Sequence, residues 1–264
     1  MKIFRNIRQK LASENLPDRQ AGKAMAYLRY AVGEILLVVI GILIALQINN
    51  WNENRKLLKQ EIEIYSELKS DLFQTKKEIS STINKHKKII KSTQSLIYDI
   101  VKKEPYSKTI YNRFASSGDD FQIIPQTSAF ESLKNIGLDI LSNDSLRIRI
   151  TDLYEIDLKR FDDELGDNNS DHSIKNILFP YQDKYFFADY NQTSKYGFKY
   201  ADSITVQKLK IKDYNKFLRD NKLLKVLQLT LYNRSRKVDL ETETIIKIDN
   251  TIKKIQKELN KLKK

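Results

Sequence analysis

The sequence predicts an all-α protein in which an N-terminal transmembrane helix continues into an elongated antiparallel helical bundle or coiled coil. The 264 residues include only 7 Gly and 4 Pro, well below average usage, so few positions favour turns. Residues 31–48 form one apolar run, and two long segments outside it place apolar residues at heptad spacing. Together these observations favour long helices over a sandwich or barrel.

The apolar run, residues 31–48, contains one charged residue, Glu34, and has the minimum length of a membrane-spanning helix. Tyr30 and Trp51 flank it, and the helix between them would measure about 32 Å, close to the hydrocarbon thickness of a bilayer. No A-x-A-like cleavage site follows, which favours an uncleaved anchor over a signal peptide. We therefore expect a transmembrane helix over residues 31–51, with the lipid bilayer as its partner, rather than a buried core helix.

The distribution of charge predicts the orientation of this anchor. Residues 1–30 carry seven Lys and Arg against two acidic residues. The positive-inside rule then makes residues 1–30 a short cytoplasmic tail and residues 52–264 a periplasmic domain of a single-pass protein in a bacterial inner membrane. The net charge of +13 lies largely at the chain ends, and the aromatic-rich stretch lies beside the acidic middle. This pattern argues against nucleic acid as a partner.

Small residues lie along one stripe of the predicted anchor. Gly33, Gly41 and Ala45 have the spacing that lets two membrane helices approach closely, so a homodimer is one interpretation. The other interpretation is chance, because the motif is common. Glu34 is either a partner or proton site within the membrane or an interfacial carboxylate reaching Arg29 or the headgroups.

Two blocks resemble an uncharacterised family of Bacteroidota membrane proteins. The first comprises MKIFRNIRQKLASEN at the start of the chain and the anchor GEILLVVIGILIALQINNWNE at Gly33–Glu53. The second is TSAFESLKNIGLDILSNDSLRIRITDLYE at Thr127–Glu155. The resemblance implies a single-pass anchor with a helical extramembrane domain. Because the family is a domain of unknown function, the resemblance implies no catalytic residues.

The extramembrane part begins with residues 49–104, which contain neither Gly nor Pro and predict one helix about 80 Å long. A second heptad seam runs through residues 224–262. Two matched seams predict an antiparallel pair of helices. Aligning their polar interruptions places Lys76 opposite Glu241, and in that register the C-terminal lysines return near Glu53 at the membrane surface.

Shorter helices are expected between the two seams. Residues 128–137 open with the capping-box pattern Ser-Ala-Phe-Glu and close with Gly, which predicts one short helix. Ser142 or Asn143 caps a second helix that runs to Gly166. The sequence Phe-Pro-Tyr at residues 179–181 is expected to end a third.

Aromatic residues are concentrated late in the chain, where nine of the 26 lie within residues 179–200. One interpretation is a surface that binds an envelope protein or a ligand, since Tyr and Phe are favoured at interface cores. The other is a structural plug that closes one end of the bundle. The candidate partner-binding residues are Phe179, Tyr181, Tyr185, Phe186, Phe187 and Tyr190.

The sequence shows no sign of catalytic chemistry. Cysteine is absent, there are two histidines, and no phosphate-binding, zinc-protease or serine-hydrolase motif is present. His86 falls on the first seam, which favours a packed side chain, and the acidic run around His172 could hold a cation or be a solvated loop. We expect a non-enzymatic protein without a cofactor, catalytic residues or a metal site. The alternatives are a transmembrane sensor or regulator and, with less support, a membrane-bound hydrolase.

Overall fold

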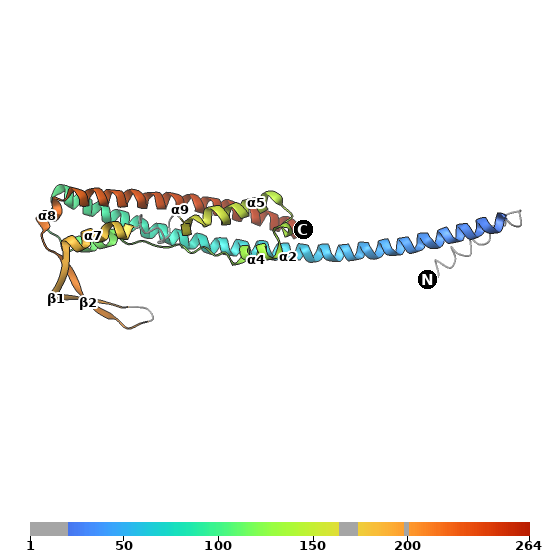
Figure 1. The fold of residues 1–264 in the computed structure, drawn as a ribbon, viewed down its shortest axis with the longest axis horizontal. Coiled ribbons are helices and arrows are strands. Elements are labelled where there is room, and N and C mark those ends of the chain that lie inside the picture. The colour runs from blue at the N-terminus through green and yellow to red at the C-terminus, as the bar shows by residue number, and fades with distance from the viewer. Residues whose placement is uncertain (1–20, 164–173, 198–200) are drawn as a thin grey trace. The chain divides into compact units, whose positions relative to one another are not determined.

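The computed structural model describes residues 21–163, 174–197 and 201–264, with side chains described from Tyr27 onward except at residues 162 and 163 (Figure 1). The chain divides into two compact units, Met1–Gln60 and Glu61–Lys264. Helices make up most of the described residues, and the strands found there form one two-stranded hairpin. The prediction of an all-α fold is therefore confirmed.

The first unit contains the beginning of helix α2, Ala21–Lys102, which runs for 82 residues without a break. The absence of Pro, and of Gly after Gly41, explains this continuity, because those residues most often interrupt helices. An 18-residue window of α2 has a mean hydropathy of 2.6, and none of it is buried. Among the described helices, this one is long and apolar enough to cross a membrane.

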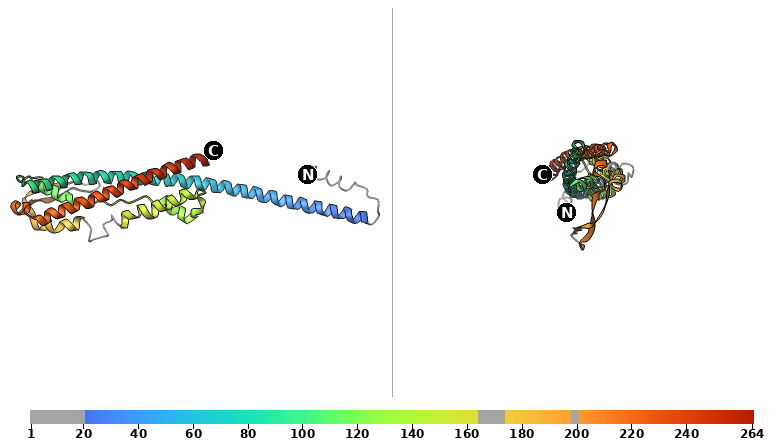
Figure 2. Two further views of the ribbon diagram at one scale, coloured as in Figure 1. Left: turned by 90° about the horizontal axis from the view of Figure 1, so that it is seen from above. Right: turned by 90° about the vertical axis from the view of Figure 1, so that its left-hand side faces the viewer.

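The second unit is a helical bundle built on two long antiparallel helices. The later part of α2 packs along α9, Asn221–Leu262, and the two helices lie side by side in Figures 1 and 2. The shorter elements are α3 (Ile110–Ser117), α4 (Ser128–Ile136), the 3₁₀ helix η1 (Leu138–Ile140), α5 (Asp144–Asp152), the π-helix η2 (Leu153–Leu158), α6 (Arg160–Asp163), α7 (Ile174–Tyr185) and α8 (Tyr214–Leu218).

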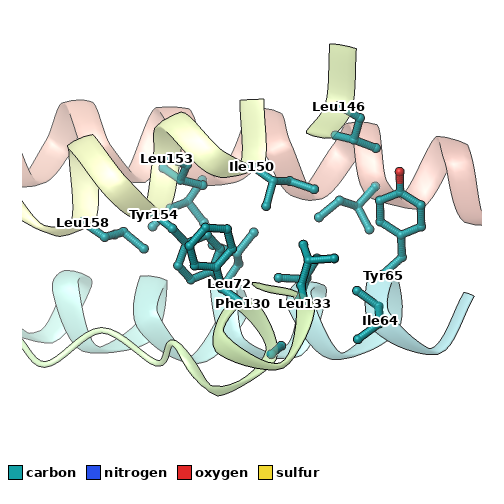
Figure 3. Packing of buried hydrophobic residues seen from close by; sticks show 14 of the residues in the cluster. Ile64, Tyr65, Leu72, Phe130, Leu133, Leu146, Ile150, Leu153, Tyr154 and Leu158 are labelled. Carbon is teal, nitrogen blue, oxygen red and sulfur yellow. The ribbon is translucent and has the colours of Figure 1, made fainter. Parts of the chain in front are cut away.

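The apolar interior of this unit consists of two separate clusters. Core 1 joins α2, α4, α5, η2 and the C-terminal half of α9, and Phe130 stacks on Tyr154 there with ring centroids 4.5 Å apart (Figure 3). Core 2 joins the end of α2, α3, α7, α8 and the N-terminal half of α9 around the fully buried Phe217. Each cluster includes residues of both long helices.

Polar side chains cap the N-termini of α5, α8 and α9. Asn143 caps α5 by accepting a hydrogen bond from the amide of Leu146 at 3.1 Å, and α5, η2 and α6 occupy the predicted second helix as far as Asp163. Gly166 lies outside the described residues.

The predicted capping box of α4 is wrong. Its amides are instead satisfied from α2, where the Asp71 carboxylate accepts from the Ala129 amide at 2.8 Å.

The predicted register of α2 against α9 is also wrong. The Lys76 ammonium lies 2.6 Å from the Asp249 carboxylate, and Lys69 donates to Gln256 at 2.6 Å. Asp249 follows the expected partner, Glu241, by about two helical turns. The predicted return of the C-terminal lysines to Glu53 depended on that register, so this prediction is no longer supported.

The hairpin consists of β1, Phe186–Tyr196, and β2, Ile204–Ile211, paired antiparallel with an irregularity between Asp189 and Thr193. It projects from the helices at the end of the bundle that holds core 2 (Figure 1). Helix α7 continues through Pro180 to Tyr185, so the predicted helix end at residues 179–181 is wrong. The strands themselves were not predicted.

Candidate functional site

The structure divides the predicted aromatic segment into a buried and an exposed part. Tyr185 and Phe186 are 2% and 5% exposed and belong to core 2, and Tyr181 is half-buried against it. The Phe186 ring lies 4.9 Å from that of Phe114, and the Tyr185 ring lies 5.3 Å from that of Phe217, centroid to centroid. These three residues join α7 and β1 to the rest of the bundle, as the plug interpretation expects.

The exposed part comprises Phe179, Phe187 and Tyr190, which are 60%, 37% and 84% exposed. Lys210, on the neighbouring strand, places its ammonium 5.2 Å from the centre of the Phe187 ring. Tyr196, further along β1, is 53% exposed. We call Phe179, Phe187 and Tyr190 the exposed aromatic group. The remaining aromatics of the predicted segment, at positions 198 and 200, lie outside the described residues.

A hollow of about 430 Å³ adjoins one member of the exposed aromatic group, Phe179. Phe179 lines it together with Phe114 and Leu178, and polar atoms come from Asp119 and Lys175. Burial raises the pKa of the Asp119 carboxyl, although the guanidinium of Arg234 acts in the opposite direction. The hollow therefore presents more polar than apolar surface and carries groups of both charges, a composition that suits a polar or charged side chain of a binding partner.

The base of the hairpin is tied to α9 through Asp220. Its carboxylate caps α9 by accepting from the amides of Lys222 and Leu223 at 2.8 and 3.1 Å. It also accepts from the Tyr185 hydroxyl at 2.5 Å and from the Lys184 ammonium at 2.7 Å. Burial alone would raise the pKa of Asp220, but these four hydrogen bonds outweigh burial and lower it.

A layer of buried polar residues crosses the middle of the bundle. His86 on α2 and Arg234 and Glu241 on α9 are at most 1% exposed. Arg234 donates to Nδ1 of His86 at 2.8 Å and to the carbonyl oxygens of Ser117 and Asp119 at 3.1 and 2.5 Å. We call His86, Arg234 and Glu241 the buried polar layer.

The hydrogen bonds of the buried polar layer determine which nitrogen of His86 carries its proton. A guanidinium only donates, so Nδ1 of His86 must accept from Arg234, and the proton lies on Nε2. Nε2 faces a Glu241 carboxylate oxygen at 3.2 Å, although the angles do not meet hydrogen-bond geometry. Burial lowers the pKa of the Arg234 guanidinium. The nearby carboxyl groups of Asp120, Asp119 and Glu241 act to raise it, but burial outweighs them. The expectation that His86 is a packed residue of the seam is confirmed.

The residues predicted for membrane helix packing lie along the exposed part of α2. Glu34 and Ala45 are exposed, and a Cβ added at Gly33 or Gly41 would meet no other atom within 4 Å. A single chain provides no helix partner against which these positions could pack. The homodimer, and the role of Glu34, therefore stay predictions.

Metal ligands do not cluster in the described part of the chain, where no group of three or more His, Asp or Glu side chains comes together. His172, around which a cation site was one interpretation, lies outside the described residues. Asp162 and Asp163, which precede it in the sequence, end helix α6.

A family whose description reads "Family of unknown function (DUF6090)" matches residues 34–188, more than half of the chain. The chain belongs to this family. The DUF6090 region contains the apolar run from Glu34, the part of α2 that enters the bundle and the described helices from α3 to α7, and it ends at Ala188 within β1. Most of the hairpin, together with α8 and α9, follows the DUF6090 region. No curated protein and no solved structure matches the chain.

Proposed function

We propose that this DUF6090 protein is a membrane-anchored, non-enzymatic protein whose helical bundle binds a partner protein in the cell envelope. The observation that carries the anchor is the unburied apolar window of α2, with its mean hydropathy of 2.6. Twelve large apolar side chains between Val32 and Ile48 are exposed. Transferring them to lipid would contribute on the order of 20 kcal/mol, which favours a bilayer over water.

The exposed aromatic group supports partner binding. Phe and Tyr side chains that are already exposed can be buried by a partner without unfolding the bundle, and aromatic residues often dominate interface energies. Tyr185 and Phe186, by contrast, can contact a partner only if core 2 opens. The proposed surface is therefore Phe179, Phe187 and Tyr190, with the adjoining hollow as a pocket for a partner side chain.

We propose the bacterial inner membrane as the location, with the N-terminus in the cytoplasm and the bundle in the periplasm. The support is the excess of Lys and Arg before the apolar run, together with the resemblance to Bacteroidota membrane proteins. A cysteine-free chain allows a direct test with a thiol reagent that cannot cross the inner membrane. Ser203→Cys should be labelled in cells with a permeabilised outer membrane, and Ser13→Cys only after lysis. The opposite pattern would reverse the orientation.

The anchor is tested by extracting membranes with alkaline carbonate. Wild-type protein should remain in the pellet, whereas Val39→Asp/Leu43→Asp, which places two charges in the apolar run, should move most of the protein to the supernatant. The matched control is Leu57→Asp/Leu58→Asp, whose positions are exposed but lie outside the run. Extraction of the wild type, or equal retention of both variants, would contradict the proposal.

The partner surface is tested with a photoreactive residue at Tyr190 in living cells. We expect a discrete cross-linked product that disappears when Phe179→Ala and Phe187→Ala are added, because these changes remove the other two aromatic side chains of the proposed surface. The matched control is a photoreactive residue at Tyr232, which is 62% exposed on α9. The same product from both positions, or its persistence in the variant, would show that the exposed aromatic group is not the binding surface.

A further inference from the structure

We propose that the buried polar layer fixes the register in which α2 pairs with α9, and that the rest of the seam would also allow a pairing shifted by one heptad. This inference concerns the second unit alone and does not depend on the proposed function. It rests on the repeat of the seam, on the threonines within it, and on the position of Arg234.

The seam repeats along both helices. Its buried residues alternate by three and four positions, apart from one step of seven between Arg234 and Glu241 on α9, so each helix superimposes on itself after seven residues. On α2 the buried line is Tyr65, Leu68, Leu72, Thr75, Ile79, Thr82, His86, Ile89, Thr93, Leu96 and Ile100. On α9 it is Leu223, Leu227, Thr230, Arg234, Glu241, Thr244, Ile248, Thr251, Ile255 and Glu258.

The threonines of α9 do not distinguish one register from another. Their hydroxyls donate to carbonyl oxygens of their own helix, from Thr230 to Leu227 at 2.8 Å, and from Thr244 and Thr251 to the residues four positions earlier at 2.9 Å. These bonds move with the helix and are kept in any pairing. Most of the remaining seam residues are apolar, and their burial is not directional.

Arg234 differs from the threonines of α9 because its bonding partners belong to other segments. It donates to His86 on α2, to the carbonyl oxygen of Ser117 at the end of α3, and to that of Asp119 just after it. A shift of one heptad moves Arg234 about 10 Å along α2, out of reach of His86. It would leave a cation in the interior without its acceptors and would separate Glu241 from His86. A buried charge that loses its partner is strongly destabilising, so the layer excludes the shifted pairing.

The remaining pairs between the two helices are weaker constraints. Lys76 and Asp249 are 34% and 38% exposed, and long exposed side chains adapt to a new neighbour at small cost. The layer also lies between core 1 and core 2, so it interrupts the apolar seam near its middle. A polar position within an otherwise apolar seam specifies register at the expense of stability, and this is how we interpret the layer.

The test uses pairs of cysteines in the full-length, cysteine-free chain in detergent micelles, joined by a short linker that reacts with two thiols. Lys76→Cys with Asp249→Cys reports the observed register. Lys76→Cys with Thr242→Cys, or with Gln256→Cys, reports a shift of seven residues in either direction. With the layer intact, the observed pair should cross-link roughly 100-fold more efficiently than the shifted pairs.

The decisive variant replaces the layer with apolar residues, His86→Leu/Arg234→Leu/Glu241→Leu. We expect the preference for the observed pair to fall to about tenfold or less, with helical content and cooperative unfolding retained. The matched control, Thr82→Val/Thr244→Val/Thr251→Val, changes three seam residues but keeps the layer and should keep the wild-type ratio.

Three outcomes would overturn the proposal. One is an unchanged ratio in the layer variant, which would mean that other contacts fix the register. Another is an equal loss of preference in the threonine control. The third concerns the case in which the layer variant does not unfold cooperatively. The test then uses the milder variant Arg234→Leu/Glu241→Leu, and the proposal is overturned if that variant folds and still cross-links only in the observed register.

Discussion

Replacing Asp220 with alanine should destabilise the second unit by about 3 kcal/mol. Loss of an N-cap side chain costs about 1 kcal/mol, and Asp220 caps the longest helix that lies wholly within this unit. Loss of the acceptor for the Tyr185 hydroxyl adds about 2 kcal/mol, because that tyrosine is buried and the bond involves a charged group. The Lys184 pair adds little, since the lysine is about half exposed.

The measurement is urea unfolding of the full chain in detergent micelles, followed by far-ultraviolet circular dichroism. Asp220→Asn, which keeps an acceptor for the helix amides but removes the charge, should lose only about 1 kcal/mol. Tyr185→Phe should lose about the same amount. An Asp220→Ala variant within 0.5 kcal/mol of wild type would refute the assignment of Asp220 as the link between α7 and α9.

The acid dependence of stability provides a second readout of the same residue. Because the folded state lowers the pKa of Asp220, its contribution is present above the pKa of an unfolded aspartate, near 3.9, and is lost as the pH falls through the lower folded value. The wild type should therefore lose stability more steeply than Asp220→Asn below about pH 4. Parallel curves would show that the carboxylate gains nothing from its partners.

Three further substitutions test separate parts of the bundle by the same unfolding assay. Phe217→Ala should cost about 4 kcal/mol, because the ring is fully buried at the centre of core 2, and a loss below 1 kcal/mol would mean that the site is loosely packed. Asp71→Ala should cost about 1 kcal/mol through the lost cap of α4, whereas Glu67→Ala, on the exposed face of the same helix, should cost almost nothing. Gly137→Ala should cost about 2 kcal/mol, since Gly137 has φ of 116°, and an unchanged midpoint would show that this backbone relaxes freely.

The long helices were predictable because their signals are local and repeated. The missing Gly and Pro, together with heptad spacing, are enough to predict α2, α9 and their antiparallel pairing. The register could not be obtained in this way, because a heptad seam matches itself after each seven residues. Threonine at positions such as 244 and 251 also made the buried line hard to recognise. Its hydroxyl donates within its own helix, which allows burial that polarity alone argues against.

The hairpin had a signal that was overlooked. Residues 204–211 read Ile-Thr-Val-Gln-Lys-Leu-Lys-Ile, in which apolar and polar residues alternate over the first four positions, as in a strand with one buried face. The cap of α4 had no local signal, because Asp71 lies more than fifty residues earlier in the chain. Contacts of this kind depend on the tertiary fold and cannot be deduced from spacing.

The aromatic segment itself was predictable from the sequence, but which of its residues are buried and which are exposed was not. Composition alone does not distinguish Phe186, which packs on α3 and α8, from Phe187, the next residue, which lies on the other face of β1. Strand geometry sends neighbouring side chains in opposite directions. Once the strand is known, the alternation separates residues that hold the fold from those open to a partner.

A bundle whose apolar interior is split into two clusters along the same helices need not lose its structure in a single step. Amide hydrogens around core 1 and core 2 can exchange with different opening free energies, although both regions share α2 and α9. Most of the DUF6090 match falls on elements that contribute to core 1 and on the elements of core 2 that precede α8. Helix α9, which follows the match, contributes residues to both clusters. A chain lacking α9 would therefore expose apolar surface along the whole length of the bundle, and α9 must be synthesised before either cluster can close.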